Sequence, residues 1–174
     1  MQQDVNLNRK IELMAAESGG FHAMISYSQQ TGSGQATILN LILTEREKLR
    51  VWFDQYYAGQ LSEQAMMQGV TSSNCLLLFV SAGVMKREFC IGEVRKAVAL
   101  GKPILLVHEE DPRFNKDPDT HEFRSFYDMR DEAPEDLRYL FKEVESLAFR
   151  RRKFEQDSMV IELLTRMKNV SERR

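Results

Sequence analysis

The sequence predicts an α/β fold, a doubly wound, five-stranded parallel sheet with helices on both faces. Two observations lead to this prediction. Along most of the 174 residues, strand-like apolar runs alternate with segments of helical periodicity, a pattern typical of parallel α/β proteins. The run Leu76–Val80 is apolar without interruption, as expected of a strand that is covered on both faces.

The stretch from Cys75 to Val107 is the clearest unit of this pattern. A polar turn follows its first strand, and apolar residues then recur at helical spacing: Phe89, Val94, Ala97, Val98 and Leu100. Gly101 ends this predicted helix before a second apolar run at 104–107. Strand, helix and strand form a right-handed crossover. Ligands of such folds bind outside the carboxyl ends of the strands, where the helix that carries Glu93 begins.

The other elements follow in order along the chain. Strands are predicted at 21–27, 50–53, 75–80, 104–107 and 146–150. Besides the helix of Glu93, helices are predicted at 35–48, 62–70, 134–145 and 154–168. Their apolar residues are expected to face the sheet: Ile38, Leu41, Ile42 and Leu49 from the first helix, and Met159, Val160, Leu163, Leu164 and Met167 from the last.

The ends of the chain and one connection are polar. Residues 1–20 have a weak helical stripe that ends in Ser18–Gly20, so we expect an arm or short helix outside the core. Residues 21–168 are predicted to form one domain, and 169–174 a polar tail. The acidic connection 108–119 is longer than usual for an α/β unit, which indicates a functional or simply exposed loop.

Composition excludes several classes of partner. The net charge of −2 leaves no basic excess for binding nucleic acid, and the basic cluster 150–153 is interpreted as a solvated turn. Cys75 and Cys90 form no disulfide or metal-ligand pattern, as in proteins of a reducing compartment. No apolar stretch reaches the ~18 residues of a membrane span, and the first residues lack a signal-peptide core. We expect a cytoplasmic protein that contacts no membrane.

Common catalytic motifs are absent from the sequence. There is no GxxxxGK[ST] phosphate loop and no GxSxG nucleophile elbow. The GSG at 32–34 is too short for a dinucleotide fingerprint, and the three histidines have no cysteine at metal-ligand spacing. A response-regulator receiver domain would need an acid pair after its first strand, where Tyr27 and Ser28 stand instead. No metal site or cofactor is predicted.

Four segments together resemble the Toll/interleukin-1 receptor (TIR) domain, a flavodoxin-like fold. They are HAMISYS at the first strand, VWFDQYYAG at the second, MMQGVTSSNCLLLFVS around the third, and SAGVMKREFCIGEV after it. The last is the most specific, because plant members carry a serine followed by Trp-Cys-x-x-Glu-Leu. Positions that correspond without a gap are Ser81, Phe89, Cys90, Glu93 and Val94.

The resemblance implies one of two functions. Some TIR domains cleave NAD+ at the nicotinamide–ribose bond, giving nicotinamide and a linear or cyclic ADP-ribose, and their catalytic glutamate corresponds to Glu93. A carboxylate suits this reaction because the ribose becomes oxocarbenium-like in the transition state. Other TIR domains are non-catalytic scaffolds that bind further TIR domains. In this interpretation Glu93 is a solvated helix residue. NAD+ as substrate and other TIR domains, including copies of this chain, are therefore the expected partners.

The resemblance also suggests residues that contact the substrate: Tyr27, Ser28, Gln29, Asp54, Tyr56, Ser81, Phe89 and Cys90. Several have alternatives. Phe89 could pack in the core, Cys90 could be a small buried residue, and Tyr56 could belong to a partner surface. Trp52 is expected to pack in the core. Several relatives place an arginine at the position of Ser28 to hold phosphate, so Lys86 or Arg87 would have to supply that charge.

Overall fold

The computed structural model describes residues 20–54 and 63–172. Its centre is a five-stranded, all-parallel sheet with strand order β2-β1-β3-β4-β5, which confirms the predicted fold class. The strands are β1 (Phe21–Ser26), β2 (Val51–Trp52), β3 (Ser73–Val80), β4 (Ile104–His108) and β5 (Leu147–Ala148). All five predicted strands are present, and the two edge strands are much shorter than expected.

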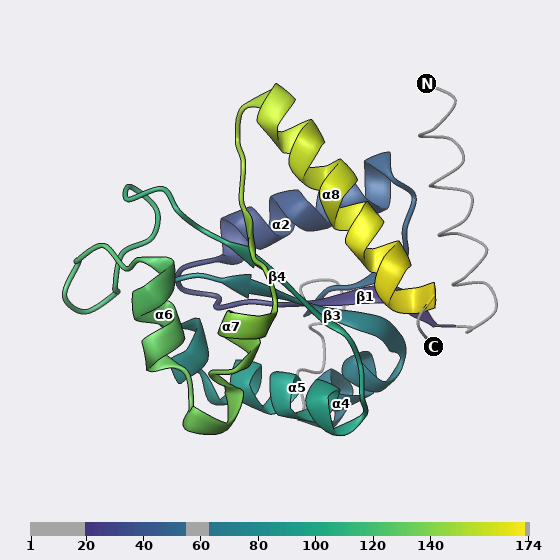
Figure 1. The fold of residues 1–174 in the computed structure, drawn as a ribbon, viewed down its shortest axis with the longest axis horizontal. Helices are drawn as coiled ribbons and strands as arrows, with labels where there is room; N and C mark the ends of the chain where they lie inside the picture. Colours follow the sequence, from purple (N-terminus) through teal and green to yellow (C-terminus); the bar gives the residue numbers. More distant parts are fainter. Residues whose placement is uncertain (1–19, 55–62, 173–174) are drawn as a thin grey trace.

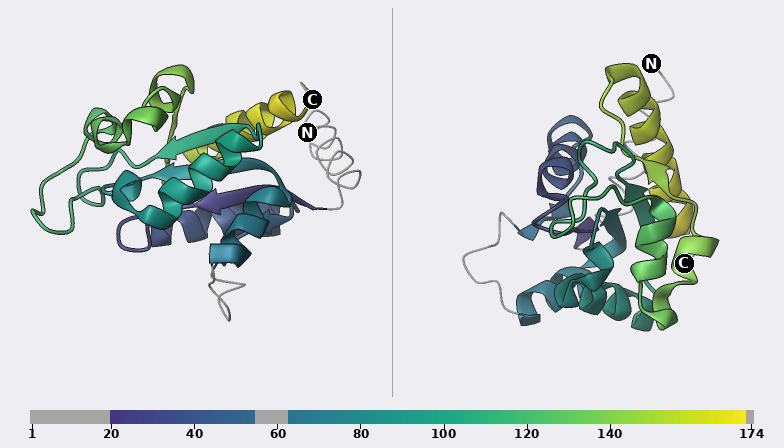
Figure 2. Two further views of the ribbon diagram at one scale, coloured as in Figure 1. Left: turned by 90° about the horizontal axis from the view of Figure 1, so that it is seen from below. Right: turned by 90° about the vertical axis from the view of Figure 1, so that its left-hand side faces the viewer.

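Helices cover both faces of the sheet (Figures 1 and 2). On one face lie α2 (Ser33–Leu41), its π-helical continuation η1 (Ile42–Arg46), and α8 (Lys153–Glu172). On the other face lie α4 (Glu63–Thr71), α5 (Glu88–Ala99), α6 (Phe126–Glu132) and α7 (Leu140–Glu143). Short 3₁₀ turns, η3 (Val84–Lys86) and η4 (Glu135–Leu137), connect elements on this second face.

Strand β3 separates two hydrophobic cores. Its side chains alternate, so that Leu77 and Phe79 pack with α2 and α8, whereas Leu76, Leu78 and Val80 pack with α4 to α7. This double burial explains the uninterrupted apolar run in the sequence. The inward face predicted for α8 is also confirmed, since all five of its named residues are buried: Met159, Val160, Leu163, Leu164 and Met167.

Two predicted helix faces are partly wrong. In α2, Ile38 and Leu41 are more than 40% exposed, and the buried residues are Ala36, Leu39, Asn40 and, in η1, Leu43. The other two residues predicted to face the core do so: Leu49 is buried, and Ile42 is partly buried against the core. In α5 the predicted inward residues Val94 and Ala97 are buried, but Phe89, Val98 and Leu100 are exposed. Cys90 and Glu93 take their place on the buried side.

The region after β4 differs most from the prediction. The single helix expected at 134–145 is instead the turn η4 followed by the one-turn helix α7. Helix α6 was not predicted, because Met129 is its only buried residue and its sequence is polar. A capping box in which Ser125 and Asp128 bond each other's backbone N–H starts it. Helix α8 continues to Glu172 and so includes the first four residues of the predicted polar tail.

The sheet topology determines where a ligand can bind. Chain order reverses between β1 and β3, which are neighbours at the middle of the sheet. In open parallel sheets a crevice forms at the carboxyl ends of the strands at this reversal. The segment after Ser26, the end of β2 and the start of α5 meet there. Among the described residues, no helix is both long and apolar enough to cross a membrane.

Candidate active site at the carboxyl edge of the sheet

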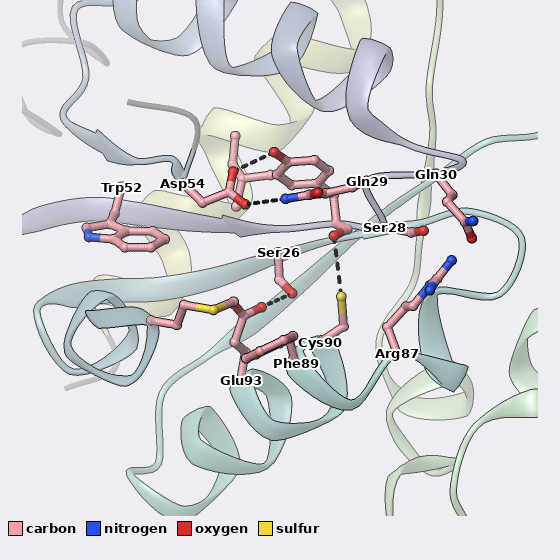
Figure 3. Close-up of a pocket in the computed structure, with 13 residues that line it drawn as sticks. Ser26, Ser28, Gln29, Gln30, Trp52, Asp54, Arg87, Phe89, Cys90 and Glu93 are labelled. Carbon is pink, nitrogen blue, oxygen red and sulfur yellow. Dashed lines mark hydrogen bonds between the residues drawn. The ribbon is translucent and has the colours of Figure 1, made fainter. Parts of the chain in front are cut away.

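A cavity of about 400 Å³ opens at this edge, between the ends of β1 and β2 and the first turns of α4 and α5 (Figure 3). Seven of the residues proposed from sequence line it: Tyr27, Ser28, Gln29, Asp54, Phe89, Cys90 and Glu93. Six others complete the lining: Ile25, Ser26, Gln30, Trp52, Met66 and Arg87. Residues far apart in the sequence therefore form one hollow, large enough for a substantial part of a nucleotide.

Glu93 is the most deeply placed acid of this cavity. Its side chain comes from the second turn of α5 and is only 3% exposed. The Ser26 hydroxyl at the end of β1 donates a hydrogen bond to Glu93 Oε2. Burial raises the pKa of Glu93 to about 7, with a contribution from the charge of Asp54, although the Ser26 hydrogen bond opposes the rise. Glu93 is therefore a carboxyl group whose charge changes near neutral pH.

Asp54, the second acid, is held by two neighbours. The Tyr27 hydroxyl donates to Asp54 Oδ1 at 2.5 Å, and the Gln29 amide lies 3.5 Å from Oδ2. The Tyr27 ring stacks on Phe53, with ring centroids 5.2 Å apart. Asp54 thus has hydrogen-bond partners on both oxygens and a fixed position, from which its negative charge acts on Glu93.

Cys90 is a packing residue at the base of the cavity. Its thiol donates to the Tyr27 carbonyl oxygen at 3.3 Å and is buried. Burial and the nearby Glu93 carboxylate raise the pKa of this thiol to about 12. A neutral thiol is a poor nucleophile, so the geometry supports the small-residue alternative for Cys90.

Two aromatic residues border the cavity differently. Phe89 is 56% exposed at the mouth, so its core-packing alternative is wrong. Trp52 is buried and lies against α4, where Gly69 has no side chain: a Cβ there would be 2.7 Å from the indole ring. Trp52 therefore packs in the core and also forms one wall of the cavity.

One of the proposed contact residues, Ser81, lies elsewhere. Ser81 is fully buried outside the cavity lining, and its hydroxyl shares a 2.7 Å hydrogen bond with Thr31. It therefore fixes the loop after β1, and its proposed role as a substrate contact is corrected. Tyr56 lies outside the described residues. Of the two candidate cations, Lys86 is directed to Glu132 and Asp117, at 3.6 and 3.9 Å, whereas Arg87 lines the cavity.

Sequence reasoning missed Ser26, the direct partner of the buried acid. The available signal was a hydroxyl residue that interrupts the apolar strand 21–27 just before its end. In a strand that faces a core on both sides, a polar side chain needs a specific partner. Nothing local identifies that partner, which lies 67 positions further along the chain.

Comparison with known proteins agrees with this architecture. The chain folds as a flavodoxin-like α/β domain with a crevice at its topological reversal. The family model of the TIR domain matches residues 24–141, and the chain belongs to this family. Comparison with curated proteins gives no match.

Two solved structures are similar in fold. The TIR domain of the Toll-related receptor TRR-2 from Hydra magnipapillata is 12% identical, with a TM-score of 0.56 over 85% of this chain and 98% of that one. The TIR domains of the activated Roq1 resistosome, which directly recognizes the pathogen effector XopQ, are 13% identical. Their TM-score is 0.47, over 86% of this chain and 82% of that one. The first likeness establishes the fold alone, and the second is too weak to support an inference.

Proposed function

We propose that this TIR domain hydrolyses NAD+ at the bond between nicotinamide and ribose, with Glu93 as the catalytic carboxylate. The observation that carries the proposal is a buried carboxyl group with a pKa near 7, exposed to a cavity of about 400 Å³ at the carboxyl edge of the sheet. Strongly perturbed acids in a cleft are typical of catalytic sites. As a TIR domain the protein would act in signalling, in the cytoplasm.

The chemistry requires one ionised carboxylate. The glycosidic C–N bond breaks, its electron pair stays on nicotinamide, and positive charge develops on the ribose. Glu93 in its charged form stabilises that charge, in a site where few water dipoles compete. Nicotinamide leaves as a neutral molecule, so no acid has to protonate it. Water then adds to the anomeric carbon and loses a proton, giving ADP-ribose; an internal nucleophile would give the cyclic product.

The direct test is nicotinamide release from NAD+ by concentrated purified protein, comparing wild type with Glu93→Gln. Loss of a group that stabilises transition-state charge is expected to lower the rate at least ~100-fold. Glu88→Gln is the matched control, because Glu88 lies on the same helix but is exposed, and it should retain wild-type activity. Equal rates for wild type and Glu93→Gln would refute the catalytic role.

A second candidate function is a scaffold that binds other TIR domains. Exposed apolar side chains favour it: Ile38 and Leu41 on α2, and Phe89 at the mouth of the cavity. Sedimentation velocity over a range of concentrations would detect self-association. If the protein is a scaffold, the Glu93→Gln variant should self-associate as well as wild type does, and the wild-type protein should release no nicotinamide. In the enzyme, association would accompany turnover, and only turnover would depend on Glu93.

A further inference from the structure

The cavity has two chemically different ends. In Figure 3, Trp52 lies at one end, Arg87 and Gln30 lie at the other, and Glu93 with Ser26 lies between them. Ser28 also lies toward the second end. We call Ser28, Gln30 and Arg87 the polar corner. A ligand that bridges both ends would have to be apolar on one side and polar or charged on the other.

Ser28 is an unsatisfied polar group in the wall of the cavity. Its residue is 2% exposed, yet its hydroxyl has no hydrogen-bond partner among residues 20–54 and 63–172. A buried hydroxyl without a partner destabilises the folded protein, and native structures rarely keep one. Because Ser28 lines the cavity, a bound ligand can supply the missing partner.

Arg87 forms no ion pair with any carboxylate of the described residues. Other arginines of the domain form ion pairs, among them Arg95 with Asp136 and Arg124 with Glu132. Within the described part of the chain, Arg87 has no carboxylate oxygen within 4 Å. Its neighbour Lys86 forms ion pairs with Glu132 and Asp117. A guanidinium group at a cavity mouth is well suited to a bidentate contact with phosphate.

We propose that the polar corner is the subsite for the phosphate groups of the nucleotide substrate. The inference rests on the proposed function for the identity of that substrate. The Ser28 hydroxyl and the Gln30 amide would donate to phosphate oxygens that Arg87 neutralises. With phosphate at this end and the anomeric carbon at Glu93, the leaving base lies toward Trp52. The cavity therefore binds its substrate in one direction.

Binding of ADP-ribose, measured by calorimetry, tests the corner without any turnover. Arg87→Gln is expected to weaken binding about tenfold or more, as for the loss of a charge-assisted hydrogen bond, whereas Lys86→Gln should bind like wild type. Ser28→Ala should weaken binding while the protein unfolds at the same or a higher temperature, because it deletes an unpaired buried hydroxyl. Unchanged binding by both Arg87→Gln and Ser28→Ala would overturn the proposal.

Substrates with and without phosphate separate this inference from the proposed function. Arg87→Gln should raise the KM for NAD+ about tenfold and leave the kinetics with nicotinamide riboside unchanged. Equal effects on both substrates would overturn the phosphate subsite while leaving NAD+ cleavage in place. If wild type releases no nicotinamide but ADP-ribose binding still depends on Arg87 and not on Lys86, the reaction is refuted and the anion subsite is supported.

Discussion

Two buried glutamates near the carboxyl edge of the sheet behave in opposite ways. Glu93 on α5 and Glu109 after β4 are 3% and 0% exposed. Glu93 accepts a hydrogen bond from Ser26, and burial raises its pKa to about 7. Burial acts on Glu109 too, but hydrogen bonds from Arg151, Gln35 and a backbone N–H outweigh it, and the pKa of Glu109 is lowered.

The difference shows that partners, rather than depth, decide the charge of a buried acid. Arg151 is bound to both oxygens of Glu109 and also lies over the ring of Phe114, at 4.3 Å from its centroid. Glu109 is therefore a structural group that fixes the long connection after β4. Glu93 has no such counter-ion in residues 20–54 and 63–172, and it faces a cavity. Only the incompletely paired acid is available for chemistry.

Removing the counter-ion of Glu109 should have the largest effect on stability. Arg151→Gln would leave a buried carboxylate unpaired, which typically costs roughly 3–5 kcal/mol. Urea unfolding at pH 7 measures this loss. Arg150→Gln is the control, because its pair with Glu110 is largely exposed and should contribute less than about 1 kcal/mol. Similar losses in the two variants would contradict the structural role of the Arg151–Glu109 pair.

Replacing the two acids should change stability in opposite directions. The pKa of Glu93 is higher in the folded protein than the ordinary value of 4.5, so its contribution to stability falls as pH rises through 7. At pH 8, Glu93→Gln should therefore be more stable than wild type by roughly 2–3 kcal/mol, and at pH 4 about equal.

Glu109→Gln is the counterpart. Because the pKa of Glu109 is lowered, its ionised form stabilises the fold, and this contribution is lost as pH falls. The variant should thus be less stable than wild type at pH 8. Thermal unfolding at both pH values measures the two changes. If Glu93→Gln is instead less stable than wild type at pH 8, the folded protein stabilises the charged form of Glu93, and the prediction is contradicted.

Activity should follow the ionisation of Glu93. Because the charged carboxylate is the working form and its pKa is about 7, the rate of NAD+ cleavage should rise with pH and level off above 7. Well below pH 7 it should fall about tenfold per pH unit. The measurement is kcat between pH 5 and 9, over a range where circular dichroism shows an intact fold. A flat profile down to pH 5 would exclude Glu93 as the titrating group.

The smallest expected effect comes from Ser26→Ala. The hydrogen bond from Ser26 stabilises the charged form of Glu93, so without it the acid limb of the pH profile should move to higher pH. The rate at pH 7 should fall about threefold, as for one ordinary hydrogen bond, and recover at pH 9. Ser73→Ala removes another buried hydroxyl, bonded to Gly69, and should leave the profile unchanged.

The sheet could be predicted because two neighbouring strands, β3 and β4, contain continuous apolar runs. Residues 76–80 are all apolar, and this pattern predicts the burial of β3 on both faces. Helix faces were harder to predict. The exposed pair of α2, Ile38 and Leu41, and the buried pair, Leu39 and Leu43, both have spacings typical of one helix face. Periodicity cannot choose between two such stripes, and the choice depends on how the helix is rotated against the sheet.

The candidate site could be predicted in part. Glu93 was found from its spacing within a family pattern and from its place on the helix after β3. Its environment could not be found in this way, because the Ser26 contact joins positions 67 apart and depends on how α5 packs against β1. For the same reason, sequence alone could not choose between Lys86 and Arg87 as the cation at the cavity.

The close contact between Gly69 and Trp52 has a consequence for substrate size. Gly69 does not line the cavity, yet a methyl group there would be 2.7 Å from the indole ring, so the ring would have to shift. A shift toward β1 would shorten the space beside Glu93 at the end assigned to the leaving base. The size of the leaving group that fits would then depend on the absence of a side chain at Gly69, although Gly69 does not line the cavity.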